Sequence, residues 1–86
     1  MPRICSFFGI IIAMYHNDHS PPHFHAVYQG HEALISIESL EVQRGALPRR
    51  ALALVLEWAF LHREELRRDW EKARQGLPLD AIQPLE

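Results

Sequence analysis

The sequence contains a single cysteine, Cys5, and no long hydrophobic run. One cysteine excludes an internal disulfide and a Cys-x-x-Cys zinc site, and a β-like neighbourhood predicts a buried, unreactive thiol. The longest apolar run, residues 7–15, is about half the roughly 18–20 residues that cross a bilayer. The segment from Tyr15 to Asp18 does not resemble a signal-peptide cleavage site. We therefore expect a cytoplasmic protein that does not enter a membrane.

An excess of positive charge is also lacking. The formal net charge is −2 at pH 7, which provides no general attraction to nucleic acid. Locally, however, three arginines and no acid lie between Arg44 and Arg50. A chain of 86 residues, 48% hydrophobic and 23% charged, has the size and composition of one folded domain. We expect a single domain over residues 1–86 with one basic edge.

The first half of the chain predicts β-strands. Residues rich in β-branched and aromatic side chains predict a central strand over 7–15, a second strand over 23–28 and a third over 31–38. Gln29-Gly30 predicts a tight turn between the last two, and residues 41–44 predict a short fourth strand. These segments indicate an antiparallel β-meander of three or four strands.

The second half predicts one long helix. Pro48 suits the first helical turn, and residues 49–75 are nearly all good helix formers. Gly76 ends the helix. The apolar stripe narrows near His62, where we expect a kink or a restart. The predicted fold class is therefore α+β, with the helix covering one face of the meander and the apolar tail, residues 77–86, lying back on the body.

Four of the six histidines fall between His16 and His25. Imidazole titrates near neutral pH and is the commonest metal ligand in proteins. His23 and His25 are two residues apart on a predicted strand, so their side chains point to the same face. Phe24 then points to the opposite face, into the core beneath the helix. The window predicts a functional site at one edge of the sheet.

A first hypothesis for this window is a metal site. His19, His23 and His25 supply imidazole nitrogens, with Asp18 as a further ligand or an orienting partner. His16 is an alternative third ligand. Such a set fits zinc or nickel.

A second hypothesis needs no metal. Paired histidines act as general acid and general base in ribonuclease and phosphoryl chemistry, which makes Asp18, His19, His23 and His25 the candidate catalytic residues. The phosphate of an RNA substrate needs cations, because arginine matches phosphate oxygens in a two-pronged way. The candidate nucleic-acid-binding residues are Arg44, Arg49 and Arg50.

Several short motifs occur together along almost the full chain. They are Phe8-Gly9-Ile10, Met14-Tyr15, Asp18-His19, Pro21-Pro22-His23-Phe24-His25-Ala26, Leu47-Pro48-Arg49-Arg50, Glu57-Trp58, His62-Arg63-Glu64-Glu65-Leu66, Trp70-Glu71 and Ile82-Gln83-Pro84-Leu85. With these motifs the chain resembles the small bacterial proteins of domain of unknown function 4160. The resemblance carries over Asp18, His19, His23 and His25 as the site.

The resemblance implies no agreed activity. It implies one member of a two-gene operon, whose neighbour is a second short protein and whose products are interpreted as a toxin–antitoxin pair. We therefore expect a component of such a two-protein module that acts on RNA through its histidine cluster. The alternative is a metal- or anion-binding interaction module without catalysis. A sheet with an open face and an open edge also predicts a homo-oligomer.

Overall fold

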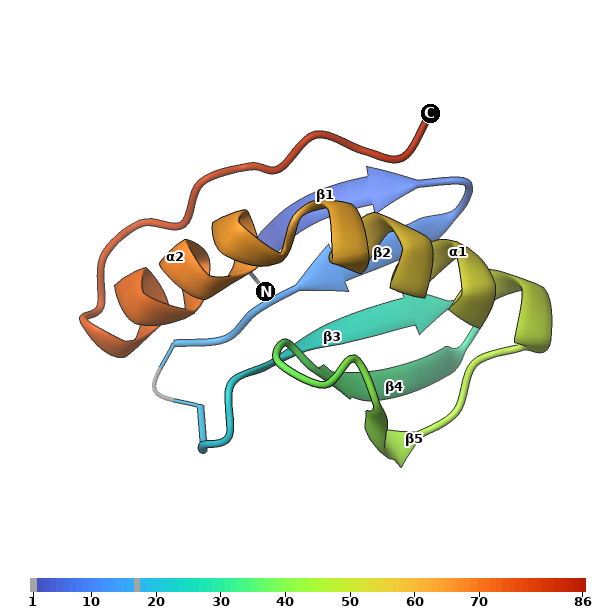
Figure 1. The fold of residues 1–86 in the computed structure, drawn as a ribbon, viewed down its shortest axis with the longest axis horizontal. Helices are drawn as coiled ribbons and strands as arrows, with labels where there is room; N and C mark the ends of the chain where they lie inside the picture. The colour runs from blue at the N-terminus through green and yellow to red at the C-terminus, as the bar shows by residue number, and fades with distance from the viewer. Residues whose placement is uncertain (1, 17) are drawn as a thin grey trace.

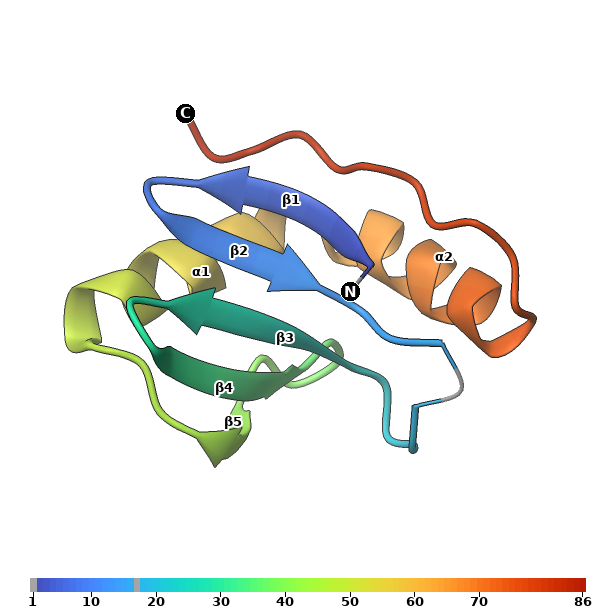
Figure 2. The same cartoon turned by 180° about the vertical axis from the view of Figure 1, so that it is seen from behind.

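Five antiparallel strands form one sheet in the computed structural model, which describes residues 2–16 and 18–86. Helices α1 (Arg49–Leu61) and α2 (Arg63–Arg74) lie across one face of the sheet (Figure 1) and leave the other face open (Figure 2). The α+β class is confirmed, but the prediction of three or four strands is wrong. Each strand pairs with the next along the chain, and in order they are β1 (Arg3–Phe7), β2 (Ile10–Ala13), β3 (His23–Tyr28), β4 (His31–Ser36) and β5 (Val42–Gly45).

The additional strand arises at the N-terminus. The apolar run of residues 7–15, predicted as one central strand, contains a turn, and β1 pairs with β2 so that Phe7 lies opposite Ile10. The two turn residues have positive φ angles, 49° at Phe8 and 80° at Gly9. A two-residue turn with two positive φ angles matches the twist of an antiparallel hairpin. The sequence hides this turn because apolar residues flank a single glycine.

The remaining strands follow the predicted order. The Gln29–Gly30 turn is confirmed, with φ angles of 46° and 82°. β4 ends earlier than predicted because the hydroxyl of Ser36 accepts a hydrogen bond from the Ser39 N–H, which turns the chain. β5 is the predicted short strand over residues 41–44, displaced by one residue.

Side chains of β3 alternate between the two faces of the sheet. Phe24 is fully buried under the helices, and its ring packs edge-on against Trp58 of α1 with 6.0 Å between ring centroids. His23 and His25 lie on the opposite face, as predicted. The core therefore forms between the helices and one face of the sheet. Its largest aliphatic members are Ile4, Ile10, Ile12, Met14, Ile35, Ile37, Val55 and Leu66.

The predicted single helix is two helices, because His62 has φ −120° and ψ 25°, outside the helical range. The expected kink or restart near His62 is thus a break of one residue between two helices. The hydrogen bonds nevertheless continue across it, from the His62 N–H to the carbonyl of Trp58 and from the Leu66 N–H to the carbonyl of His62. α1 and α2 therefore lie end to end as one bent rod (Figure 1). Among the described residues, neither helix is long and apolar enough to cross a membrane.

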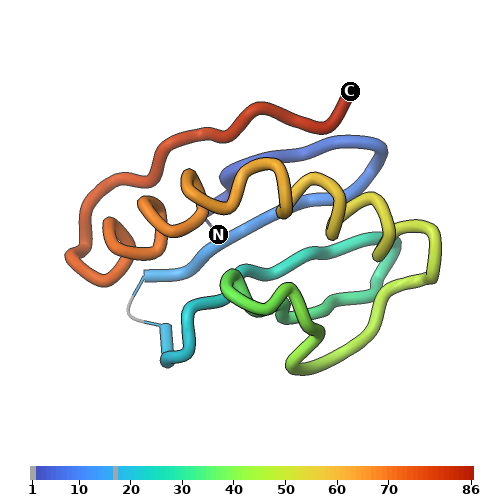
Figure 3. The backbone as a smooth tube through the Cα atoms, in the orientation of Figure 1, coloured from blue at the N-terminus to red at the C-terminus, as the bar shows by residue number. Residues whose placement is uncertain are grey.

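The tail, residues 77–86, runs back along the body of the protein (Figure 3), as predicted. Its Ile82 N–H donates to the carbonyl of Ile4 on β1 at 2.9 Å. The carbonyl of Gln83 accepts the indole N–H of Trp58 at 2.8 Å. The tail therefore covers the core and satisfies the one polar group of a fully buried tryptophan.

A buried carboxylate on α2 also contacts the tail. Oδ1 of Asp69 accepts the Asp80 N–H at 2.9 Å, whereas Oδ2 is buried without a hydrogen-bond partner among the described residues. Burial is the largest influence on the pKa of Asp69 and raises it, and the hydrogen bond from Asp80 opposes this rise without cancelling it. An ionised Asp69 is therefore destabilising.

We predict that Gly45→Ala destabilises the protein far more than Gly30→Ala. Both glycines have positive φ angles, 77° and 82°, which cost an alanine about 1–2 kcal/mol. A Cβ at Gly45 would also overlap the carbonyl oxygen of Glu32 on β4, while a Cβ at Gly30 meets nothing within 4 Å. Urea unfolding should show a loss of about 1–2 kcal/mol at Gly30 and at least twice that at Gly45. Equal losses would contradict the close approach of β5 to β4.

We predict that Asp69→Asn stabilises the protein near neutral pH. The asparagine keeps an oxygen for the Asp80 N–H and removes the buried charge. The folded-state pKa of Asp69 is raised above its ordinary value of 3.8, so the penalty is absent below pH 3.8 and develops as the pH rises through the raised pKa. Urea unfolding should give the variant about 1–2 kcal/mol more stability than wild type at pH 7, and no advantage below pH 3.8. A pH-independent advantage would rule out charge as the cause.

Candidate functional site

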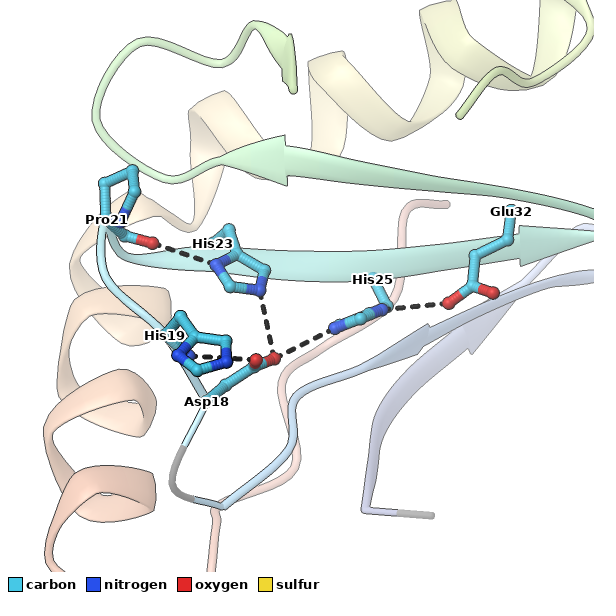
Figure 4. A network of polar contacts seen from close by, with 6 residues as sticks. All are labelled: Asp18, His19, Pro21, His23, His25 and Glu32. Carbon is cyan, nitrogen blue, oxygen red and sulfur yellow. Dashed lines mark hydrogen bonds and ion pairs between the residues drawn. The ribbon is translucent and has the colours of Figure 1, made fainter. Parts of the chain in front are cut away.

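The histidine window lies where the loop between β2 and β3 meets the open face of the sheet (Figure 4). Asp18 comes from this loop, His23 is the first residue of β3, and His25 follows on the same face. His25 lies opposite Ala13 of β2 and opposite Leu34 of β4. The two imidazoles are therefore held by the interior of the sheet, and the carboxylate reaches them from the loop.

One oxygen of Asp18 is shared between two imidazoles. Its Oδ2 atom lies 3.0 Å from Nε2 of His23 and 3.1 Å from Nε2 of His25. The histidine side chains are 5% and 12% exposed, and that of Asp18 is 22% exposed. Both Nε2 atoms are thus directed at one partly accessible oxygen.

The second nitrogen of each ring also has an acceptor. Nδ1 of His23 lies 2.8 Å from the carbonyl oxygen of Pro21, and Nδ1 of His25 lies 2.9 Å from Oε2 of Glu32 (Figure 4). A carbonyl oxygen and an ionised carboxylate only accept hydrogen bonds, so each Nδ1 is the donor. The backbone and Glu32 therefore fix the orientation of both rings and leave the two Nε2 atoms facing Asp18.

The sequence analysis did not identify Glu32. The Gln29–Gly30 turn sets the pairing of β3 with β4. In this pairing Glu32 lies opposite Val27 and diagonally across from His25 on the same face. The predicted pairing of these two strands was therefore sufficient to place Glu32 next to the His25 imidazole.

Two aromatic side chains pack against the imidazoles. The Tyr15 ring meets His25 edge-on at 4.5 Å between centroids, and the Trp70 ring lies 5.2 Å from that of His23. Trp70 is buried and brings α2 into contact with the site. These contacts restrict the rings further and exclude water from their inner sides.

The environment keeps Asp18 ionised. Burial is the largest influence and by itself raises the pKa of Asp18, but hydrogen bonds from His25 and the His19 amide, with the charge of His23, lower the pKa by more. The net pKa of Asp18 is below its ordinary value of 3.8. The stabilisation that its ionised form provides is fully present above that value and is lost only as the pH falls through the lowered folded-state pKa.

The other two histidines of the window lie outside the cluster. The backbone N–H of His19 donates to Oδ1 of Asp18 at 2.9 Å, and its side chain lines the groove beside the cluster. Nε2 of His16 contacts the carbonyl of Leu77 in the tail at 3.1 Å. His19 therefore orients Asp18 through its backbone, and His16 joins the loop to the tail.

The three predicted nucleic-acid-binding arginines do not converge. Arg44 lines the same groove as the cluster, which has a volume of about 470 Å³ and includes Leu34 and Gln43. Arg50 borders a separate pocket of about 310 Å³ beside Phe8 and Tyr28. Arg49 is exposed in the first turn of α1. Arg44 alone of the three is placed to act together with the histidines.

The three side chains at the centre of the site have the composition of a metal centre. Each of Asp18, His23 and His25 offers one ligand atom, and these atoms lie within 4.8 Å of one another. Tetrahedral zinc with bonds of about 2.0–2.1 Å separates its ligand atoms by roughly 3.3 Å. The observed separations of 3.0 and 3.1 Å from Oδ2 are within a few tenths of an ångström of that value.

Fold and site together define an α+β protein with a histidine–carboxylate cluster on the open face of an antiparallel sheet. Residues 9–71 match the family model of the domain of unknown function DUF4160, and this range contains the whole cluster and the three arginines. The chain belongs to this family, as the resemblance predicted. No curated protein and no solved structure matches the chain.

Proposed function

We propose that this protein binds a divalent transition metal ion, with zinc as the best fit, through Asp18, His23 and His25. One observation carries the proposal: a carboxylate oxygen and two Nε2 atoms converge while each Nδ1 is held by its own acceptor. In metal sites a ligating histidine typically donates its other N–H to a carboxylate or a backbone carbonyl. Glu32 and the carbonyl of Pro21 are partners of these two kinds.

Charge at the cluster supports a cation at its centre. If both Nδ1 atoms donate outward, the Nε2 atoms hydrogen-bond to Asp18 only when they also carry protons. Both rings are then cationic, with 5.4 Å between their centroids and the side chain of His23 almost fully buried. Two like charges at this distance repel each other, and the carboxylates of Asp18 and Glu32 offset that repulsion. A single divalent ion carries the same total charge as two cationic imidazoles. It would be bound by one lone pair each from Asp18, His23 and His25.

The proposed site is open on one side. Three protein ligands leave at least one position of a tetrahedral ion vacant, which is the arrangement of catalytic rather than purely structural zinc sites. The adjoining groove of about 470 Å³ gives a small molecule access to that position. His19 also lines the groove, but it is not among the three residues whose ligand atoms converge.

We predict one equivalent of zinc per chain, measured by elemental mass spectrometry on untagged protein and by a competition titration. Asp18→Asn and the double variant His23→Ala/His25→Ala should weaken zinc affinity by at least about 100-fold. Glu32→Gln, which alters only the partner of His25, should weaken it by about 10-fold.

His31→Ala is the matched control, because His31 is exposed on β4 and lines no part of the groove. It should bind zinc like wild type. Absence of zinc from the wild-type protein after incubation with the ion, or uptake that survives the double variant, would contradict the metal site.

A second candidate function is the predicted toxin-like role in a two-protein module that acts on RNA, with an operon-encoded partner and a second copy of the chain as predicted partners. The shared groove favours it, because Arg44 there supplies a cation for phosphate beside the histidines. A metal-free acid–base mechanism is less favoured, because both Nε2 atoms face Asp18 and neither is directed at a substrate hydroxyl.

We predict that expression of the wild-type chain without its partner slows bacterial growth, and that Asp18→Asn and His23→Ala/His25→Ala relieve the effect. The His31→Ala variant, at equal expression by immunoblot, should slow growth as wild type does. Growth curves and the integrity of total cellular RNA are the two measurements. Equal toxicity of all variants would show that the histidine cluster is not required for toxicity.

A further inference from the structure

An arginine without an ion pair stands beside the proposed metal site. Arg44 of β5 lies opposite Leu34 of β4, and Leu34 lies opposite His25 of β3, so the three side chains share the open face. Adjacent strands are about 4.8 Å apart, which places the backbones of His25 and Arg44 roughly 10 Å apart. Among the described residues Arg44 forms no ion pair. The groove is therefore bounded by a ligand histidine on one side and a guanidinium on the other.

The charges around this groove select an anion. With a divalent ion and neutral imidazoles, the carboxylates of Asp18 and Glu32 balance the ion, which leaves the positive charge of Arg44 uncompensated. A ligand with one negative charge completes the balance. A doubly charged ligand is disfavoured by Glu32, which lines the groove and is half exposed.

The floor of the groove restricts the ligand further. Leu34 is half-buried between His25 and Arg44, so the part of the ligand between the two charged ends rests on an apolar side chain. A volume of about 470 Å³ lies within the roughly 300–1,000 Å³ of small-molecule sites. A groove of this volume takes a small group, such as one phosphate with its sugar.

We propose that the groove binds a phosphodiester of a single-stranded nucleic acid, whose two non-bridging oxygens are shared between the bound ion and Arg44. The diester has the required single charge, and its sugar lies on Leu34. Arginine binds two phosphate oxygens at about 2.7–2.9 Å, whereas lysine acts as a point charge. This assignment depends on the proposed metal site and names Arg44, and not Arg49 or Arg50, as the residue that recognises phosphate.

The test uses the full chain loaded with zinc and a short fluorescent single-stranded RNA, followed by anisotropy across a salt series. Arg44→Gln should weaken binding about tenfold and reduce the slope of log affinity against log salt by about 0.7, the value for one lost phosphate contact on a single strand. Arg44→Lys should restore the slope but not the affinity. Arg50→Gln is the matched control, since Arg50 borders a different pocket, and it should match wild type.

Three comparisons separate the outcomes. Single-stranded DNA of the same sequence distinguishes the shared phosphodiester from recognition of the ribose hydroxyl, and adenosine 5′-monophosphate as competitor tests the preference for one charge over two. If the chain takes up no zinc, the metal site itself fails. If zinc binds but RNA binding is absent, independent of zinc or equally sensitive to Arg50→Gln, the metal site survives and the phosphodiester assignment is overturned.

Discussion

The alternation of side chains along β3 is the constraint on which both core and site depend. Phe24 packs against Trp58 beneath the helices, and this contact forces His23 and His25 onto the open face. A shift of one residue in the pairing of β3 would bury the imidazoles under the helices and expose Phe24. The free energy of burying an aromatic side chain therefore sets the position of the polar cluster.

The same strand explains why the two imidazoles of the cluster are held close to the Asp18 carboxylate. His23 and His25 are held by strand pairing, by Tyr15 and Trp70, and by outward hydrogen bonds from their Nδ1 atoms. Rings fixed in this way cannot turn their Nε2 atoms away from Asp18. Two nitrogens and an ionised oxygen are therefore kept together, which is the arrangement that the proposed metal ion would occupy. A preorganised, partly open set of this kind suits ion binding better than proton transfer between separated groups.

Much of the fold follows from local patterns. The Gln29–Gly30 hairpin, the start of α1 after Pro48 and the docking of the apolar tail depend on turn chemistry and hydrophobic periodicity, and each was predicted correctly. The β1–β2 hairpin was not predicted, because the end of β1, the turn and β2 form one apolar run from Phe7, in which Gly9 is the single turn-forming residue. The break at His62 was expected as a kink or a restart, because the apolar stripe narrows there.

The sequence by itself determined the fold class, the family, and the grouping of Asp18, His23 and His25, because these depend on residues near one another in the chain. Only the tertiary structure decided which candidates act together. It placed Arg44 in the groove and Arg50 in another pocket, and directed the side chain of His16 to the tail. These placements depend on the pairing of β4 with β5 and on the contact of the β2–β3 loop with the tail. Contacts between residues far apart in the sequence cannot be inferred from any single segment, whereas hydrophobic periodicity can.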